Sequence, residues 1–438
     1  MAMRLQSLWR PIQAAQTLRL FSSSSRRLKV LPLSRLPDCI IPRYVQSPTT
    51  DLLSLTWPEP PRNILFVGKS HSDAVTLSLL ECSQHLTEQY PNTRLIFEPA
   101  TAAALHDQLP FDIYATGDNS ELTKKVDLTA TFGGDGTILH ASSLFSTSAH
   151  VPPILAFSMG TLGFLGEWKI SDYKRAFREA FTSGTSASLE PIERDECEQV
   201  TSERPMPFSL SEPTHWDGSH SRPTTRGRGS KVLLRNRLKV GIYDERGERV
   251  CISTECDIRG ADIHGDTHAM NELTIHRGAS PHLAVISIFI GGRFLTEAVA
   301  DGMIISTPTG STAYSLSSGG SIIHPLVSSL LLTPICPRSL SFRPLVLPSN
   351  AEIRMSLGER NRGTEMEVSI DGRRCERGVG VGMEIRVVGE EIVTKDGEMM
   401  GGVPCIVGGP KGRAGDDGWV GGLNGLLKFN YPFGEEAG

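Results

Sequence analysis

The first half of the chain alternates short apolar runs with an amphipathic helical pattern. The apolar runs have the length of buried strands and occur at residues 63–67, 94–97, 126–132 and 153–157. Between the first two runs, residues 73–85 repeat apolar positions at helical spacing. Strands that alternate with helices favour parallel pairing and right-handed crossovers. We therefore expect an open, mainly parallel, Rossmann-like α/β domain over residues 61–183.

The second half of the chain changes to strand patterns. Apolar runs of strand length occur at residues 232–234, 238–243, 272–275, 283–290, 303–306, 367–370 and 384–388. Short strands separated by Gly, Asp and Asn turns are typical of antiparallel sandwiches and barrels. We expect an all-β, sandwich-like domain over residues 184–400, with its chemistry in the loops.

Two further segments lack such patterns. Residues 202–230 are rich in Ser, Pro, Arg, Gly and His without periodicity, which predicts a mobile surface insertion. From residue 401 the chain is rich in glycine until an apolar stretch at 419–433. We expect residues 401–438 to return to the α/β domain.

The N-terminus has the composition of a mitochondrial presequence. Residues 1–37 carry seven basic residues and no acidic one, and Arg19-Leu20-Phe21 before a run of four serines resembles a processing site. A disordered basic tail or a membrane-surface helix remains an alternative. We expect residues 1–37 to direct the protein to the mitochondrial matrix, followed by a proline-rich linker at 38–60.

Overall composition excludes several classes of protein. A formal charge of -5 implies no general basic surface, so we expect no nucleic-acid partner. No apolar run approaches the ~20 residues that span a bilayer. The eight cysteines include no Cys-x-x-Cys pair, which indicates buried thiols. His264 and His268 have a metal-ligand spacing, but Gly265-Asp266 between them favours a turn.

The most informative motif is a glycine-rich turn at residues 133–137. It follows a strand pattern and precedes a helical one, so its backbone N–H groups are exposed to an anion. Its members are Gly133, Gly134, Asp135, Gly136 and Thr137. A phosphate site with one built-in acid indicates phosphoryl transfer, because that chemistry needs positioning and charge neutralisation. An ordinary Gly/Asp turn is the structural alternative.

Two other glycine-containing segments exclude known nucleotide fingerprints. Gly68-Lys69-Ser70 resembles the end of a Walker A loop, but Asn63 stands where its first glycine belongs, so Lys69 is a nucleotide-binding candidate outside a P-loop. The glycines of residues 160–166 lack Rossmann spacing, which argues against a dehydrogenase. In that turn Phe164 offers an aromatic face to a purine ring, unless it is a core residue.

Two polar stretches in the second half are unusual for plain structure. Asn271-Glu272 opens a strand with an amide beside a carboxylate, able to pair with a base edge and ribose hydroxyls. Residues 306–314 are dense in hydroxyls, include Thr309, and supply short donors to a phosphate-bearing ligand. A strand end and a solvated turn are the structural alternatives.

These motifs together resemble the NAD kinase family. The resemblance rests on Gly-Gly-Asp-Gly-Thr at 133–137, Gly-Thr-Leu-Gly-Phe at 160–164, Asn-Glu at 271–272 and the hydroxyl-rich loop at 306–314, and it continues at 319–325, 334–344, 369–372 and 419–433. With its presequence the chain is most similar to the mitochondrial NAD/NADH kinases of fungi. The resemblance implies the NAD kinase/diacylglycerol kinase-like fold and transfer of the ATP γ-phosphoryl group to the adenosine ribose 2′-hydroxyl of NAD⁺ or NADH.

The resemblance also assigns roles to residues. Asp135 matches the catalytic acid that orients or deprotonates the 2′-hydroxyl, while the glycine turn contacts phosphates. Phe164 matches a residue against adenine, Asn271 and Thr312 bond the adenine edge, and Glu272 lies near ribose.

Further positions and partners follow from the same resemblance. Asp301, Ala313 and Tyr314 match residues that line the second nucleoside, and Ser317 matches another substrate contact. Mg²⁺ is expected with ATP. The family builds its site across subunits, which implies a homo-oligomer, a dimer or a tetramer. A diacylglycerol-type lipid kinase and a non-catalytic dinucleotide sensor on the same fold are the competing interpretations.

Overall fold

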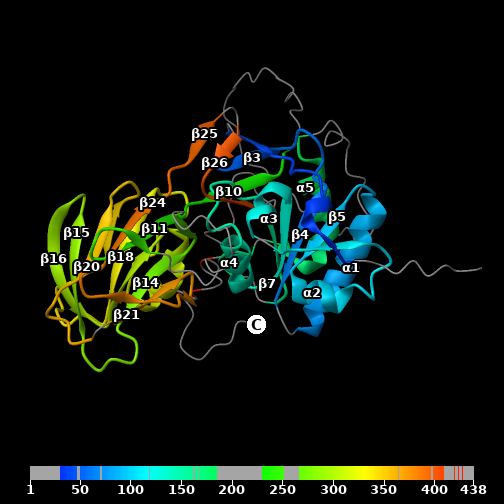
Figure 1. The fold of residues 1–438 in the computed structure, drawn as a ribbon. Helices are drawn as coiled ribbons and strands as arrows, with labels where there is room; N and C mark the ends of the chain where they lie inside the picture. The colour runs from blue at the N-terminus through cyan, green and yellow to red at the C-terminus, as the bar shows by residue number, and fades with distance from the viewer. Residues whose placement is uncertain are drawn as a thin grey trace, which may run out of the picture.

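The chain forms an α/β half and a β-sandwich half, which lie side by side in the computed structural model (Figure 1). The structure describes residues 30–46, 50–69, 72–117, 119–160, 163–166, 168–184, 229–250, 266–363, 365–395 and 398–408, and residues 419, 423 and 427. The predictions for residues 1–29, for most of the insertion and for most of the segment after residue 408 lie outside these residues. No helix in the described part of the chain has the length and apolar character needed to cross a membrane.

The α/β half is built on one eleven-stranded sheet. Its order is β1-β6-β5-β4-β7-β8-β27-β10-β3-β2, and β9 pairs with β8. The strands are β1 (Val30–Pro32), β2 (Arg43–Gln46), β3 (Leu53–Thr56), β4 (Asn63–Gly68), β5 (Arg94–Phe97), β6 (Ile113–Ala115), β7 (Leu128–Gly133), β8 (Ile154–Ser158), β9 (Trp168–Lys169), β10 (Lys231–Arg235) and β27 (Val403–Ile406). Pairing is parallel from β1 to β27 and antiparallel from β27 to β2.

Helices cover both faces of this sheet. The helical elements are η1 (Leu33–Arg35), α1 (Asp73–Gln89), α2 (Pro99–Leu105), α3 (Asn119–Lys125), α4 (Asp135–Ser143), η2 (Ile170–Asp172) and α5 (Tyr173–Thr182). Apolar residues of α1, α2 and α5 pack into one core with Phe66 and Phe132, and those of α3 and α4 pack on the other face with Leu65 and Val67. Because strand β4 is buried on both faces, it reads as a continuous apolar run in the sequence.

The order of the strands reverses beside β4. From β4 the chain adds β5 and β6 on one side, and β7 and β8 then continue on the other side. Ligands of open α/β sheets bind outside the carboxyl ends of the strands at such a switch point. The ends of β4 and β7, Gly68 and Gly133, therefore mark the expected site.

Three predicted boundaries differ from the structure. Residues 43–46 and 53–56, which the sequence analysis placed in a linker, form β2 and β3 of the main sheet. Residues 30–35, within the predicted presequence, form β1 and η1, and Leu33 is buried. Strand β10 belongs to the α/β sheet rather than to the β-rich domain, because it pairs with β27 and β3.

The sandwich half consists of two seven-stranded antiparallel sheets. Sheet B has the order β12-β11-β24-β20-β15-β16, with β13 on β11, and sheet C has the order β19-β18-β17-β14-β21-β22, with β23 on β21. The strands of sheet B are β11 (Leu238–Tyr243), β12 (Arg249–Val250), β13 (Thr267–Ala269), β15 (Ala284–Ile290), β16 (Arg293–Ala300), β20 (Ile353–Leu357) and β24 (Glu384–Gly389). Those of sheet C are β14 (Glu272–His276), β17 (Gly302–Ser306), β18 (Ser329–Ile335), β19 (Leu345–Pro348), β21 (Glu365–Ile370), β22 (Arg373–Arg374) and β23 (Val379–Gly380).

One apolar core joins the two sheets of the sandwich. Alternate residues of sheet B, such as Ile286 and Ile288, meet residues of sheet C, such as Leu273, Ile275 and Ile305. Two short helical turns, η5 (Thr309–Thr312) and α6 (Tyr314–Ser317), follow β17, and a hairpin of β25 (Val393–Lys395) and β26 (Glu398–Met400) leads from β24 to β27. The α/β plus sandwich fold predicted from the sequence is confirmed.

Candidate active site

The glycine turn lies at the switch point of the α/β sheet. Strand β7 ends at Gly133, Gly134 caps the helix, and α4 begins at Asp135. The backbone N–H of Lys69, just after β4, donates to the carbonyl of Phe132 at 3.0 Å, so the exposed Lys69 stands beside the turn. The ends of β4 and β7 and the N-terminus of α4 therefore meet at one place, and a helix N-terminus offers backbone N–H groups to phosphate.

Glycine is required at some positions of this turn and leaves space at others. A Cβ at Gly133 would lie 2.1 Å from Oγ1 of the buried Thr137, so only glycine fits there. At the exposed Gly134 and Gly136 an added Cβ would meet nothing within 4 Å. The turn is thus tight on its inner side and open on its outer side, where a ligand can approach.

The carboxylate of Asp135 is held by the following turn of the chain. Its Oδ2 accepts the N–H of Phe164 at 3.0 Å and its Oδ1 accepts the N–H of Leu165 at 3.1 Å. A Cβ at Gly163 would lie 2.1 Å from Oδ1, so the close approach depends on that glycine. Each carboxylate oxygen keeps a further acceptor site. Asp135 is therefore oriented, half-exposed and able to take a proton.

Arg235 connects this turn to the sandwich. Its side chain is only 2% exposed. Nη2 lies 3.4 Å from the carbonyl oxygen of Phe164, and Nη1 lies 3.5 Å from Oγ1 of Thr309 in the hydroxyl-rich loop. Phe164 and Thr309, predicted to bind nucleotide, are thus within reach of one guanidinium.

The Asn271-Glu272 pair is buried and oriented through its backbone. The carboxylate of Asp371 accepts the N–H groups of Met270, Asn271 and Glu272 at 2.8, 2.7 and 3.1 Å. Asp371 and Gly372 have φ values of 48° and 74° and form the two-residue turn between β21 and β22. This turn fixes the strand end from which both side chains project.

The side chains of this pair carry polar atoms without partners. Oδ1 of Asn271 and Oε2 of Glu272 are buried and have no hydrogen-bond partner among the residues that the structure describes. Burial, and secondly the charge of Asp371, raises the pKa of Glu272 to about 8. Buried polar groups normally have partners, so two unsatisfied oxygens on adjacent residues indicate a bound polar ligand. At neutral pH the Glu272 carboxyl is largely protonated and able to donate.

The hydroxyl-rich loop is fastened to the same strand end. Thr307 donates its N–H to the carbonyl of Asn271 at 2.9 Å and its Oγ1–H to that of Met270 at 2.6 Å. A Cβ at Gly310 would lie 2.1 Å from the Asn271 carbonyl oxygen. Within the loop Thr309 is buried, Thr312 and Ala313 are half-buried, and Tyr314 and Ser317 are exposed. The loop and the Asn-Glu pair therefore form one unit.

Asp301 does not join this group. It lies at the start of β17, whereas the hydroxyl-rich loop follows the end of β17, and the pairing of β17 with β14 sets Gly302 opposite His276 and Ser306 opposite Glu272. Gly302 and Ser306 are four positions apart, which separates them by roughly 14 Å along the strand. Within one chain, Asp301 is thus remote from Asn271 and Glu272.

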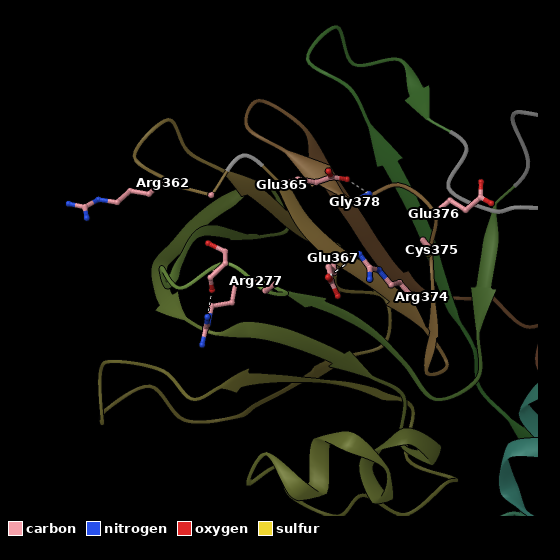
Figure 2. A pocket seen from close by; sticks show the side chains of 11 residues that line it. Arg277, Arg362, Glu365, Glu367, Arg374, Cys375, Glu376 and Gly378 are labelled. Atoms are coloured by element: carbon pink, nitrogen blue, oxygen red, sulfur yellow. Dashed lines mark hydrogen bonds and ion pairs between the residues drawn. The ribbon is translucent and has the colours of Figure 1, made fainter.

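A polar cavity lies beside Asp301 instead. Arg277, one wall of the cavity, pairs with Asp301 at 2.6 Å. The cavity has a volume of about 410 Å³, and Figure 2 shows Arg374 beside Glu367 and Arg362 pointing away from the other labelled side chains. Its mixed charges give no single ligand class, and no residue of the glycine turn lines it.

Comparisons with known proteins agree with this geometry. Residues 71–184 match the model of the ATP-NAD kinase N-terminal domain, and residues 270–388 match that of the C-terminal domain. The mitochondrial NADH kinase of Schizosaccharomyces pombe is 36% identical over 94% of this chain and 87% of its own length. The chain belongs to the NAD kinase family. The model of the N-terminal domain covers the glycine turn, and the model of the C-terminal domain covers the Asn-Glu pair. Both parts of the candidate site therefore lie in segments typical of this family.

Two further relatives support the assignment to the NAD kinase family. The mitochondrial NADH kinase of Saccharomyces cerevisiae is 32% identical over 94% of this chain and 91% of its own length. A crystal structure of yeast NADH kinase complexed with NADH superposes with a TM-score of 0.70, at 33% identity, and covers 94% of this chain and 100% of that chain. The predicted family is therefore confirmed.

The donor set of this NAD kinase suits a metal that arrives with its substrate. Among the described residues no group of three or more His, Cys, Asp or Glu side chains could hold a metal ion. His264 lies outside the described residues, and the ring Nδ1 of His268 lies 2.8 Å from the carbonyl oxygen of Ser146. Mg²⁺ in nucleotide enzymes is typically held by phosphates, water and one or two carboxylates. The single carboxylate of the glycine turn, Asp135, fits that pattern.

Sequence reasoning missed several residues that build the NAD kinase site. Asp371, Thr307 and Gly163 orient the candidate site residues, but none of the three was singled out as a site residue. Asp371-Gly372 is a favoured hairpin dipeptide directly after the strand pattern at 367–370, so that turn was detectable. Arg235 carries no comparable signal, because its contacts come from segments 71 and 74 positions away in the sequence.

Proposed function

We propose that this chain is an ATP-dependent NAD(H) kinase whose active site joins the glycine turn to the Asn271-Glu272 pair. The reaction transfers the γ-phosphoryl group of ATP to the 2′-hydroxyl of the adenosine ribose of NAD⁺ or NADH, giving NADP⁺ or NADPH. Family membership and the NADH kinases among its relatives support the activity. The observation that carries the proposed site is the Asp135 carboxylate, fixed by two backbone N–H groups at the start of α4.

In this proposal Asp135 acts as the general base. The ribose 2′-oxygen attacks the γ-phosphorus, its proton passes to the Asp135 carboxylate, and ADP departs. The N–H groups of the glycine turn and the N-terminus of α4 stabilise the phosphate charge, with Lys69 beside them. Such acid-base assistance typically contributes ~10²–10⁴-fold to a rate.

The dinucleotide is placed by the sandwich together with Phe164 of the α/β half. Phe164 lies against adenine, and Asn271 and Thr312 bond its edge. The protonated Glu272 donates to a ribose or phosphate oxygen, which satisfies a carboxyl that has no partner for Oε2 among the described residues. Its partnerless buried oxygen supports this role.

Mg²⁺ bound with ATP would offset the repulsion between the donor phosphates and the incoming oxygen. The carboxylate that the glycine turn offers to it is Asp135. The expected signature is a dependence of turnover on Mg²⁺ that EDTA abolishes and added Mg²⁺ restores; turnover unaffected by EDTA would contradict it.

The remote position of Asp301 favours a homo-oligomer, a dimer or a tetramer. If Asp301, Ala313 and Tyr314 line the second nucleoside, Asp301 must come from another copy of the chain. Mixing and refolding two inactive variants, Asp135→Asn and Asp301→Asn, should then restore part of the activity, because some sites combine one intact set of residues. A mixture that stays as inactive as its components would exclude a shared site.

The N-terminal segment is proposed to direct the enzyme to mitochondria, as the names of its relatives suggest, and specifically to the matrix. Cleavage must leave β1 intact, because this strand pairs with β6 and the following Leu33 is buried. The mature chain should therefore begin before Val30 and not at residue 38. N-terminal sequencing of the protein from purified matrix tests this, and a first residue beyond 35 would overturn it.

The decisive experiment for the function compares NAD⁺ and NADH as acceptors on one purified sample. Initial rates are measured with ATP and Mg²⁺, and the product is identified as the 2′-phosphate by its use in an NADP-dependent dehydrogenase. We expect turnover with at least one acceptor. Dinucleotide binding without product would instead indicate a non-catalytic sensor, and phosphorylation of diacylglycerol would indicate a lipid kinase.

A further inference from the structure

The chain passes between its two halves at two neighbouring points. The first passage leads from β10 to β11, and the second leads from β24 through the β25–β26 hairpin to β27. Strands β11 and β24 are paired, with Leu238 opposite Gly389. Arg237 stands immediately before β11 and Glu390 immediately after β24, so these residues mark the two passages.

Arg237 and Glu390 form a buried two-point ion pair, here named the clamp. Nε of Arg237 lies 2.7 Å from Oε2 of Glu390, and Nη2 lies 2.6 Å from Oε1. Their side chains are 1% and 7% exposed. The backbone N–H of Glu390 also donates to the Arg237 carbonyl at 2.8 Å. The planar guanidinium suits this geometry, which a lysine cannot reproduce.

The clamp also forms hydrogen bonds with the α/β half. Arg237 donates from Nη1 to the carbonyl of Phe145 at 3.1 Å and from Nη2 to that of Ser148 at 2.8 Å. Oε2 of Glu390 accepts the N–H of Gly402 at 2.8 Å, just before β27. Phe145 and Ser148 follow α4 directly. The clamp therefore holds the C-terminal end of the helix that begins with Asp135.

Two other contacts fix the same end of α4 to segments next to the Asn-Glu pair and to the Asp-Gly turn that supports it. His268 donates its N–H to the carbonyl of Ser146 at 2.9 Å, and Nη1 of Arg373 donates to Oγ of Ser143 at 2.8 Å. His268 precedes Asn271 by three residues, and Arg373 follows the Asp-Gly turn. In Figure 1, α4 lies on the side of the α/β half that faces the sandwich.

The length of α4 converts a small tilt into a displacement at its other end. The nine residues of α4 give a lever of about 13 Å at ~1.5 Å per residue, so a tilt of about 5° moves Asp135 by ~1 Å. A misplacement of that size can cost ~10²-fold in rate. We propose that Arg237, paired with Glu390, is a positioning residue that sets the angle of α4 and thereby places Asp135 against the dinucleotide held by the sandwich; this rests on the proposed kinase function.

A purely structural role makes a different prediction. Replacing both members of a buried ion pair by apolar residues is often neutral for stability, whereas removing one leaves an unpaired buried charge. If the clamp only stabilises the fold, the double replacement should recover stability and turnover together. If Arg237 positions α4, turnover should stay low, because the carbonyls of Phe145 and Ser148 have lost their donor.

The test compares Arg237→Met, Arg237→Met/Glu390→Met and Arg237→Lys with the wild type, by thermal unfolding and by kcat and KM for NADH and ATP. We expect the single Met variant to unfold at the lowest temperature and the double variant to regain most of that loss. The double variant should keep KM for ATP within about twofold while kcat falls ~10²-fold. Arg237→Lys, which retains a charge for Glu390, should lower kcat by about tenfold.

The matched control is Arg354→Met/Glu384→Met, an ion pair that lies within sheet B. It should leave kcat unchanged. A folded double variant or Lys variant of the clamp with kcat within threefold of the wild type would overturn the proposal. Should the double variant fail to fold, the Lys variant alone decides. Absence of 2′-phosphorylated product from the wild type would instead refute the proposed function.

Discussion

Asp135 in the α/β half and Glu272 in the sandwich half are both acids of the candidate active site, but their surroundings differ. Asp135 begins a helix on a glycine turn, and two N–H groups about 30 positions away in the sequence hold its half-exposed carboxylate. Glu272 is buried, and a carboxylate 99 positions away holds its backbone. Asp135 is presented as a hydrogen-bond acceptor, whereas burial raises the pKa of Glu272 to about 8, so that Glu272 is largely neutral at pH 7.

The difference indicates that the two acids have different roles in one site. A carboxylate that accepts a proton must reach the reacting hydroxyl and keep an acceptor position free, and each oxygen of Asp135 keeps such a position beside its one backbone N–H. A carboxyl that recognises a polar ligand can instead be kept protonated by burial, so that it donates. In the proposed site the α/β half supplies the general base and the sandwich half supplies most of the recognition.

Removing the charge of Asp135 tests the chemical side of this comparison most strongly. Asp135→Asn should lower kcat by about 10³-fold, since general-base assistance is lost, while NADH binding and thermal stability stay near wild type. Initial rates and calorimetric titration measure both. The matched control is Asp73→Asn, at the exposed start of α1, which should leave kcat unchanged. More than a tenth of wild-type kcat in Asp135→Asn would remove Asp135 from its assigned role.

Displacing the Asp135 carboxylate without removing it tests whether its position matters as well as its charge. In Gly163→Ala the new Cβ would lie 2.1 Å from Oδ1 of Asp135, so the carboxylate must shift. We expect kcat to fall by about 10²-fold, as for a 1 Å misplacement. Gly117→Ala is the control, because a Cβ there meets nothing within 4 Å. Equal rates for both alanine variants would mean that the position of the carboxylate is not critical.

Weakening the support of the Asn-Glu pair should affect recognition more than chemistry. Asp371→Asn leaves one acceptor oxygen for three N–H groups, so we expect KM for NADH to rise about tenfold with a smaller change in kcat. Steady-state kinetics at saturating ATP measure this. Asp244→Asn removes a similar backbone acceptor from the exposed turn before β12 and should change neither constant. A kcat effect larger than the KM effect would contradict the assignment of recognition to the Asn-Glu pair.

Replacing Glu272 by a residue that does not titrate should have the smallest effect of these changes. The effect is on the pH dependence of stability. Its pKa is about 8 in the folded chain against an ordinary value of 4.5, so the folded state binds more protons between these values and stability falls as pH rises. The free energy of unfolding should decrease by up to about 1.4 kcal/mol per pH unit in this window. Denaturant unfolding of Glu272→Gln should lack this decrease, whereas the exposed Glu59→Gln should keep it. An unchanged slope in Glu272→Gln would show that Glu272 is ionised when folded.

The sequence predicted the elements whose signals are local. Strands β4 and β5 are continuous apolar runs, and the glycine turn combines a strand end with a helix start, so both were detectable. The prediction of a linker at β2 and β3 was wrong, because these strands are short and β10, which joins β3 to the rest of the sheet, lies about 178 positions later in the chain. The fold class needed only the local signals, whereas the boundaries needed the long-range pairings.

The same distinction holds within the candidate site. Asp135, Asn271, Glu272 and the hydroxyl-rich loop were found from their chemistry and spacing. The supports of these residues were not, since Asp371 acts on a strand about 100 positions away. The separation of Asp301 from the loop was implicit in the apolar run at 303–306, because a strand between two residues keeps them apart.

Strand β27 constrains the order in which the chain can fold. It lies between β8 and β10 in the α/β sheet, yet it is made after every strand of the sandwich. A nascent chain therefore cannot close its larger sheet until residue 406 has been synthesised, and until then β8 and β10 each lack a neighbour. Such late, distant pairing slows folding and prolongs the exposure of unpaired strand edges. The two halves should consequently complete their folding together, and β27 should be the last of the described strands of the larger sheet to pair.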